Sequence, residues 1–391
     1  MALALRDVVQ RHESLRTYYP DSPYGPRQEI LPESSVDLDL VPHDVTEAEA
    51  SQRLFALAGT GFDVTTDVPL RTALYRISET EHVLAVVMHH IASDGSSLGP
   101  LASDVMGAYV SRSRGEAPQW TPLPVQYADY ALWQHDLLGA DENPSVDAQR
   151  QIQFWTSALA GIPDLLSLPT DRQRPPRQSY RGKEIHFTIG SDTADRLRDL
   201  AVGSGASLFM VVHAAFAALL ARLGNSADIT IGSPIAGRGH ESLDALVGMF
   251  VNTLALRTQV NTAAPFTDLL NHTRDQDLAA FAHADLPFER LVEIIDPVRS
   301  TARHPLFQVA LSFQNLTPTM FELPGLQIAA VGAPVETAKF DLHLTVTPGD
   351  SGSMSRRSPM QRICSTNPQW RHSPTVCFAF SIRSVETRTS R

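Results

Sequence analysis

Cysteine is almost missing from this chain of 391 residues, since its only two cysteines are Cys364 and Cys377. Residues 1–350 therefore contain no disulfide, no cysteine nucleophile and no thiolate metal ligand. The histidines lie in predicted loops and helices without the spacing of a zinc site, so the sequence predicts no bound metal. A long cysteine-free stretch is typical of a reducing compartment, and we expect a cytoplasmic protein.

Basic charge and long apolar runs are also scarce. The formal net charge is −11, which argues against nucleic acid as a partner because phosphate contacts need a basic face. No apolar run is long enough to span a bilayer, and the N-terminus lacks the basic-then-apolar layout of a signal peptide, so we expect no membrane association. With 43% hydrophobic residues the chain can bury a large core, and its length predicts two lobes.

Hydrophobic periodicity predicts a mixture of strands and helices whose alternation is α+β or α/β in character. Within the helix predicted for 207–223, Ser207 is the expected N-cap, and the expected buried face is Phe209, Val212, Phe216, Leu219 and Leu220. The other predicted helices cover residues 2–15, about 98–114 and 146–159. The predicted strands cover residues 72–76, 83–88, 183–189, 229–231, 254–258, 308–313 and 341–346.

The segment from Met88 to Gly95 ends an apolar strand with two histidines, a carboxylate and a glycine. Side chains alternate along a strand, so His89 and His90 are expected to point to opposite faces. A strand-end histidine facing a cleft can take a proton from an attacking amine, and we assign that role to His90 and a structural role to His89. Gly95 is expected to open a helix whose free N–H groups face an oxyanion. The alternative is a satisfied strand-end histidine with Asp94 as an N-cap.

Further motifs occur along the chain in a fixed order. Together with the histidine motif they resemble the condensation domain of nonribosomal peptide synthetases, whose signature is HHxxxDG. The resemblance extends from about residue 5 to residue 348. The motifs that carry it are Arg11–Thr17, Tyr127–Trp133, Val247–Thr253 with Arg257, His283–Glu289 and Arg303–Leu306.

The resemblance implies an α+β fold, an α/β two-layer sandwich, with two lobes similar to chloramphenicol acetyltransferase. The lobes would form a V-shaped pseudo-dimer with the active site in a tunnel between them. The expected divisions are a first lobe at 1–143, a connector rich in proline at 144–182 and a second lobe at 183–350. The family also places a strand and a helix before the first residues of this chain, so the first lobe is expected to lack its leading edge.

The implied reaction is attack by the amine of an acceptor aminoacyl thioester on the thioester carbonyl of a donor. The donor and acceptor would be held by 4′-phosphopantetheine arms on partner carrier proteins, next to adenylation domains, and no metal or nucleotide is implied. Ser96 stands where the family often has tryptophan, which weakens any inference about the acceptor. Two alternatives remain: a stand-alone acyltransferase that uses a carrier or coenzyme A, and an inactive remnant.

The supporting residues are assigned more loosely. A buried Asp94 needs a positive partner, and Arg257 is the first candidate and Arg16 the second. The amide of Asn252 is expected either to brace the tunnel or to serve a turn. Trp133 is expected to pack and to support the tunnel rather than to contact substrate.

The character of the chain changes at residue 351. Residues 351–391 contain seven arginines and one acid, and their hydrophobic periodicity disappears. Residues 359–366 can be encoded by CCT ATG CAG CGG ATC TGT TCA ACC, which in an adjacent frame spells Tyr-Ala-Ala-Asp-Leu-Phe-Asn, similar to the family's Tyr-x-x-Asp-Leu-Phe-Asp. We therefore predict a frameshift and expect the second lobe to lack its closing strand; the alternative is a genuine basic extension.

Overall fold

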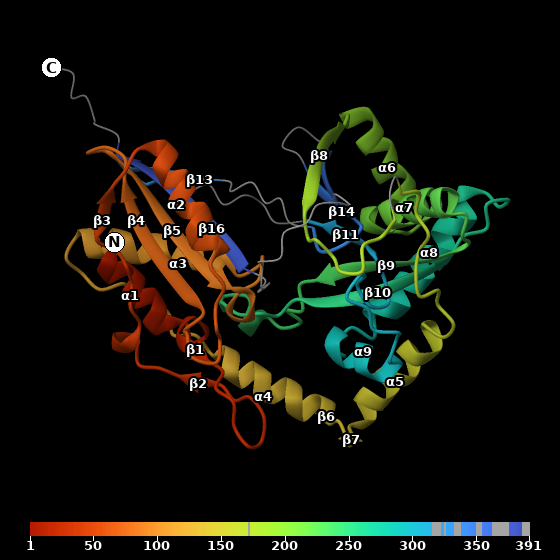
Figure 1. The fold of residues 1–391 in the computed structure, drawn as a ribbon, viewed down its shortest axis with the longest axis horizontal. Coiled ribbons are helices and arrows are strands. Elements are labelled where there is room, and N and C mark those ends of the chain that lie inside the picture. The colour runs from red at the N-terminus through yellow and green to blue at the C-terminus, as the bar shows by residue number, and fades with distance from the viewer. Residues whose placement is uncertain are drawn as a thin grey trace.

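The computed structural model describes residues 1–170, 173–314, 322–323, 326–331, 338–348, 354–361 and 375–384. They form two lobes, each built on a mixed sheet of six strands (Figure 1). Helices α4 (Tyr127–Leu138) and α5 (Val146–Ala158) connect the lobes along one side, with the short strands β6 (Gly139–Ala140) and β7 (Asn143–Pro144) between them.

In the first lobe the central strand β5 is covered on both faces, which explains why its sequence is continuously apolar. Leu84, Val86 and Met88 pack against α1 and α3, while Val83 and Ala85 pack toward α2. The helices are α1 (Ala2–Arg11), α2 (Glu47–Gly59) and α3 (Leu98–Ser113). The strands, in their order across the sheet, are β12 (Glu322–Leu323), β13 (Leu326–Val331), β16 (Thr375–Ser384), β5 (Glu81–His89), β4 (Leu70–Arg76) and β3 (Pro42–Asp44).

The sheet of the second lobe carries its helices on the side away from the first lobe (Figure 1). Val309, Leu311, Leu344 and Val346 point toward those helices and form one core with them. The helices are α6 (Ser191–Gly203), α7 (Leu208–Gly224) and α8 (Phe266–Phe281), and α9 (Phe288–Ile295) packs against α5. The strands, in order, are β10 (Asn252–Gln259), β9 (Asp228–Ile235), β11 (Val309–Phe313), β14 (Leu342–Pro348), β15 (Met354–Gln361) and β8 (Gly182–Ile189).

The remaining elements are short. Near the first lobe, strands β1 (Thr17–Tyr18) and β2 (Glu29–Ile30) pair with each other. The 3-10 turns are η1 (Glu13–Arg16), η2 (Glu33–Ser35), η3 (His90–Ala92) and η4 (Glu241–Leu243).

The boundaries of the lobes differ from the predicted ranges in one respect. Strands β12 and β13 belong to the sheet of the first lobe although they fall within the range 183–350. Ile328 of β13 is accordingly buried in the core beneath α1 and α3. The chain exchanges strands between the lobes here, a long-range pairing that local sequence pattern does not encode.

The expectation that residues after 350 supply no closing strand is wrong at two places. Strand β15 lies between β14 and β8, and strand β16 pairs with β5 from Thr375 opposite His89 to Arg383 opposite Glu81. The expected gap in the second lobe is therefore filled by backbone from the basic segment. Of residues 359–366, whose codons suggest the frameshift, residues 362–366 lie outside the described part of the chain. The frameshift stays a prediction.

Helix α7 confirms the predicted cap, because the N–H of Met210 donates to Oγ of Ser207 at 3.2 Å. Its buried face was predicted incorrectly at Leu219, which is 50% exposed. Met210, His213 and Ala217 are buried instead. Contacts with both α6 and α8, in addition to the sheet, rotate the buried stripe away from Leu219.

No single helix in the described part of the chain has the length and apolarity to cross a membrane; α6 and α7 meet that test only as a pair bent by 105°. No group of three or more His, Cys, Asp or Glu side chains in the same part of the chain is arranged to hold a metal ion.

Candidate active site

The histidine loop, residues 89–97, begins where β5 ends. His90 opens the 3-10 turn η3 and is partly exposed, and its Nδ1 lies 2.8 Å from the carbonyl oxygen of Ser93. A carbonyl oxygen can only accept, so Nδ1 carries the proton of the neutral ring and the lone pair lies on Nε2. No described residue hydrogen-bonds to Nε2. The hydrogen bond to Ser93 thus fixes the tautomer of the His90 ring, and Nε2 is its basic nitrogen.

His89 is held in the opposite way. Its Nδ1 accepts the backbone N–H of Ile91 at 3.1 Å, and its ring packs edge-on against Phe62 with centroids 6.0 Å apart. Desolvation, and then the neighbouring His90, lower the pKa of His89, which favours its neutral form. The lone pair of that neutral ring is already used inside the loop. The geometry therefore supports His90 rather than His89 as the reacting base.

Asp94 is fully buried and its carboxylate is saturated with donors. Oδ1 accepts from the backbone N–H and from Oγ of Ser97, both at 2.8 Å, and Oδ2 accepts from the N–H of Phe250 at 3.0 Å. Phe250 belongs to the bridging loop, residues 236–251, which runs from β9 to β10 of the second lobe. A first-lobe carboxylate thus holds a second-lobe backbone.

The positive partner of Asp94 is Arg238, not Arg257 or Arg16. Nη2 of Arg238 lies 3.4 Å from Oδ1 of Asp94 and donates to Oγ of Ser97 at 2.9 Å. Its guanidinium also stacks 4.2 Å from the ring centroid of Phe250. Sequence reasoning missed Arg238, although an arginine between two glycines directly after a strand is a usable signal.

Both arginines predicted for Asp94 have other partners. Arg257 forms a two-bond ion pair with Asp228, at 2.9 and 2.7 Å, and donates Nη1 to the carbonyls of Ala158 and Ala160. Arg16 donates to the carbonyls of Val9 and Leu31 and to other groups near α1. Strand pairing brings Arg257 to its partner, because Asp228 of β9 lies opposite Gln259 of β10, two residues from Arg257.

Ser97 is the second residue that the sequence did not single out. Its Oγ lies 2.9 Å from the carbonyl oxygen of Gly248 and 3.1 Å from the N–H of the same residue. The hydroxyl therefore contacts Asp94 in its own loop and the bridging loop at once. Two further bonds hold the bridging loop to the first lobe: Ser14 Oγ donates to the carbonyl of Val247 at 2.6 Å, and the hydroxyl of Tyr127 donates to that of Met249 at 2.8 Å.

Gly95 does not open the helix, which corrects the sequence-based expectation. Helix α3 begins at Leu98 with Ser97 as its N-cap, and Gly95 lies exposed in the loop before it. Residues 95–97 separate Asp94 from the start of the helix, and this turn lets the carboxylate of Asp94 accept the backbone N–H of Ser97. An oxyanion contact from Gly95 stays a prediction.

Asn252 and Trp133 act at a distance from the histidine loop. The amide nitrogen of Asn252 donates to the carbonyls of Ala284 and Leu286, and its oxygen accepts from the N–H of Phe288. Its amide therefore shapes the entry into α9 instead of facing a substrate. Trp133 is 57% exposed on α4 and packs on the ring of Tyr130 with centroids 5.9 Å apart.

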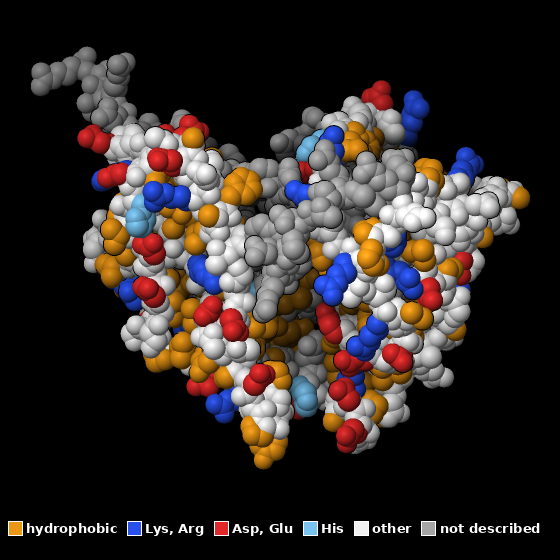
Figure 2. Space-filling model, in the orientation of Figure 1, with side chains coloured by type: hydrophobic (Ala, Val, Ile, Leu, Met, Phe, Trp, Pro, Cys, Tyr) orange, Lys and Arg blue, Asp and Glu red, His pale blue; other side chains and the backbone are white. Residues whose placement is uncertain are grey.

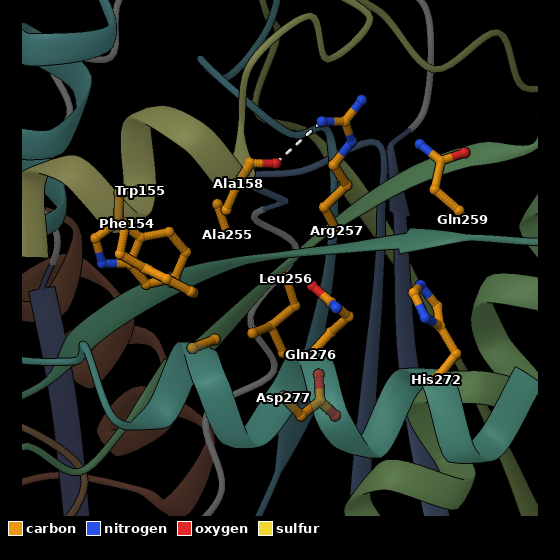
Figure 3. A pocket seen from close by; sticks show the side chains of 11 residues that line it. Phe154, Trp155, Ala158, Ala255, Leu256, Arg257, Gln259, His272, Gln276 and Asp277 are labelled. Atoms are coloured by element: carbon orange, nitrogen blue, oxygen red, sulfur yellow. Dashed lines mark hydrogen bonds between the residues drawn. The ribbon is translucent and has the colours of Figure 1, made fainter.

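A hollow between the lobes, with hydrophobic side chains inside it, is visible in Figure 2. A separate pocket of about 220 Å³ lies in the second lobe, between α5, β10 and α8 (Figure 3). Its lining includes Phe154, Leu256 and Gln276 but no residue of the histidine loop. Figure 3 shows the guanidinium of Arg257 turned toward the carbonyl of Ala158.

The sequence model of the condensation domain family matches residues 1–357. The chain belongs to this family. A dimodular nonribosomal peptide synthase from Bacillus subtilis is 45% identical over 344 residues, which are 88% of this chain and 14% of that protein. This condensation domain therefore spans about a seventh of that relative.

Solved structures agree with the family and the fold. The X-domain from teicoplanin biosynthesis is 33% identical with a TM-score of 0.84, covering 92% of this chain and 80% of that one. The SgcC5 protein from Streptomyces globisporus is 26% identical with a TM-score of 0.69, covering 91% and 82% respectively. The predicted α+β fold with two chloramphenicol acetyltransferase-like lobes is confirmed for this condensation domain.

Proposed function

We propose that this condensation domain forms amide bonds between two groups bound to carrier proteins. The amine nitrogen of an acceptor aminoacyl thioester attacks the thioester carbonyl carbon of a donor acyl or peptidyl group. The carbon–sulfur bond then breaks, the amine loses a proton, and the donor carrier's sulfur leaves as a thiol. Both thioesters are formed on the 4′-phosphopantetheine arms of partner carrier domains. Adenylation domains load the aminoacyl groups onto those arms.

The tautomer of His90 is the observation that carries this proposal. With Nδ1 bound to the carbonyl of Ser93, the free lone pair of Nε2 can take the proton of the attacking amine or hold that amine in line. Asp94, Ser97 and Arg238 support it by fixing the loop against the bridging loop.

We further infer a cytoplasmic location, because the leaving group is a free thiol that stays reduced there. The relatives are multidomain synthetases, such as the Bacillus subtilis protein, of which this chain matches 14%. That likeness supports carrier and adenylation domains as the partners.

The test is a competition between donors in one assay. The same acyl group is offered on a carrier protein and on coenzyme A, with an aminoacyl carrier protein as acceptor, and the amide product is measured by mass spectrometry. We expect product from the carrier-bound donor at a rate that His90→Ala lowers by about 100-fold or more. Product from coenzyme A and a free amine or alcohol instead would favour a stand-alone acyltransferase. No product from either donor with a well-folded chain would favour an inactive remnant.

A further inference from the structure

A second polar cluster lies on the face of the second-lobe sheet opposite its helices. Leu311 and Leu344 point into the helical core, so their neighbours Ser312 and His343 point to the other face. The helices lie on the side away from the first lobe, so Ser312 and His343 face the side where the first lobe and His90 lie (Figure 1). Both side chains are partly exposed.

Ser312 and His343 form a short pair. Oγ of Ser312 lies 2.7 Å from Nε2 of His343, and the ring of Phe340 meets that of His343 edge-on with centroids 5.7 Å apart. Among the described residues nothing hydrogen-bonds to Nδ1 of His343. Burial, and then the charge of Lys339, lower the pKa of His343 to about 4, so the ring is neutral near pH 7. The pair therefore keeps one ring nitrogen available on the cleft side.

Lys339 adds a positive charge to this cluster. Desolvation lowers its pKa, and no carboxylate in the described part of the chain pairs with it. The adjacent acid, Asp341, is engaged by the guanidinium of Arg174. Part of Lys339 remains exposed to solvent, where an anionic group carried into the cleft can reach it. A cation without a counter-charge is stabilised by such an anionic ligand.

We propose that Lys339, His343 and Ser312 bind the carboxylate side chain of a residue carried into the cleft. The ammonium of Lys339 pairs with one carboxylate oxygen, and His343 donates from Nδ1 to the other while Ser312 donates to Nε2. The site would select an acidic donor or acceptor residue over its neutral isostere. This inference rests on the proposed function, because carrier-bound aminoacyl groups are the ligands that enter the cleft.

The test uses two unreactive compounds, aspartyl and asparaginyl aminopantetheine amides, in which an amide replaces the thioester. Each is prepared with a free α-amine as an acceptor mimic and with an acetylated amine as a donor mimic, and binding to the full chain is measured by calorimetry. We expect the aspartyl compound of one mimic pair to bind about tenfold more tightly than its asparaginyl counterpart. The pair that shows the preference identifies the side from which the acidic residue comes.

Lys339→Met should bring the two affinities to within about twofold, and His343→Gln should reduce the preference part of the way. Lys183→Met is the matched control, since Lys183 is the chain's other lysine, and it should leave the preference unchanged. Equal binding of the aspartyl and asparaginyl compounds, or an unchanged preference in Lys339→Met, would overturn the carboxylate site alone. Failure of all four compounds to bind the parent chain would instead count against the proposed function, and the site would fall with it.

Discussion

The carboxylate of Asp94 accepts the backbone N–H of Phe250 at 3.0 Å, and this bond joins the histidine loop of the first lobe to the bridging loop of the second. Oγ of Ser97, also in the histidine loop, contacts the carbonyl of Gly248 in the bridging loop. Arg238 of the bridging loop contacts the side chains of both Asp94 and Ser97. The position of His90 relative to the second lobe therefore depends on a small buried network.

Replacing the two histidines should separate catalysis from packing. His90→Ala should lower amide formation by about 100-fold or more and leave the melting temperature nearly unchanged, because Nε2 has no described partner in the protein. His89→Ala should lower the melting temperature, since it removes the contact with Phe62 and the bond from Ile91. Steady-state rates and calorimetric melting of both variants provide the measurement. Full activity of His90→Ala would reject its assignment.

Asp94 and Arg238 should be coupled in a double-mutant cycle. Asp94→Asn alone leaves a buried guanidinium without its charge partner, and a loss of about 3–5 kcal/mol in the free energy of unfolding is expected. The double variant with Arg238→Met should lose less free energy of unfolding than the sum of the losses in the two single variants. Arg257→Met is the control: it shares no partner with Asp94, so its effect should add to that of Asp94→Asn within about 0.5 kcal/mol. Urea unfolding measures all the variants, and additivity of Asp94 with Arg238 would contradict the pairing.

Gly237 should not tolerate a side chain. Its φ is +65°, and a Cβ there would overlap the carbonyl group of Phe250 in the same bridging loop. Gly237→Ala should therefore displace the loop and lower both stability, by about 1–3 kcal/mol, and condensation activity. Gly239→Ala is a close control because a Cβ at Gly239 meets no atom within 4 Å. Equal melting temperatures for the two variants would show that the loop adjusts freely.

Acid should destabilise the protein through His343. An unfolded chain takes up the histidine proton as the pH falls through 6.5, whereas the folded protein resists until the pH reaches about 4. The contribution is thus fully present above pH 6.5 and is lost as the pH falls toward 4, by up to about 3 kcal/mol. Urea unfolding at pH 7.5 and 4.5 should show a smaller loss for His343→Gln than for the parent. His272→Gln, at an exposed position, should behave like the parent.

The reading-frame prediction is decided by the coding DNA. Across the codons for residues 359–365, the adjacent frame should spell Tyr-Ala-Ala-Asp-Leu-Phe. Strand β15 ends at Gln361 within this stretch, so a corrected frame would change the sequence of a strand that pairs with both β14 and β8. If the DNA does not contain that sequence in the adjacent frame, residues 351–391 are a genuine basic segment.

The local features of this protein could be predicted from short stretches of its sequence. The apolar run before His89 predicted a strand, and Ser207 marked the start of α7. His90 lies in the turn η3, beyond the end of the strand, so the expectation that His89 and His90 point to opposite faces stays a prediction. These features depend on short-range geometry, on strand pleating and on capping, which a few adjacent residues specify. The order of the motifs indicated the family for the same reason: each motif is local and can be read in place.

Contacts between residues from distant parts of the chain could be identified only from the folded structure. Asp94 and Arg238 are 144 residues apart, and nothing near either one specifies the other, so Arg257 and then Arg16 were predicted as the partner instead. The exchange of β12 and β13 into the first lobe and the exposure of Leu219 likewise depend on which surfaces meet. A buried carboxylate requires a positive partner, but the path of the folded backbone determines which arginine lies next to it.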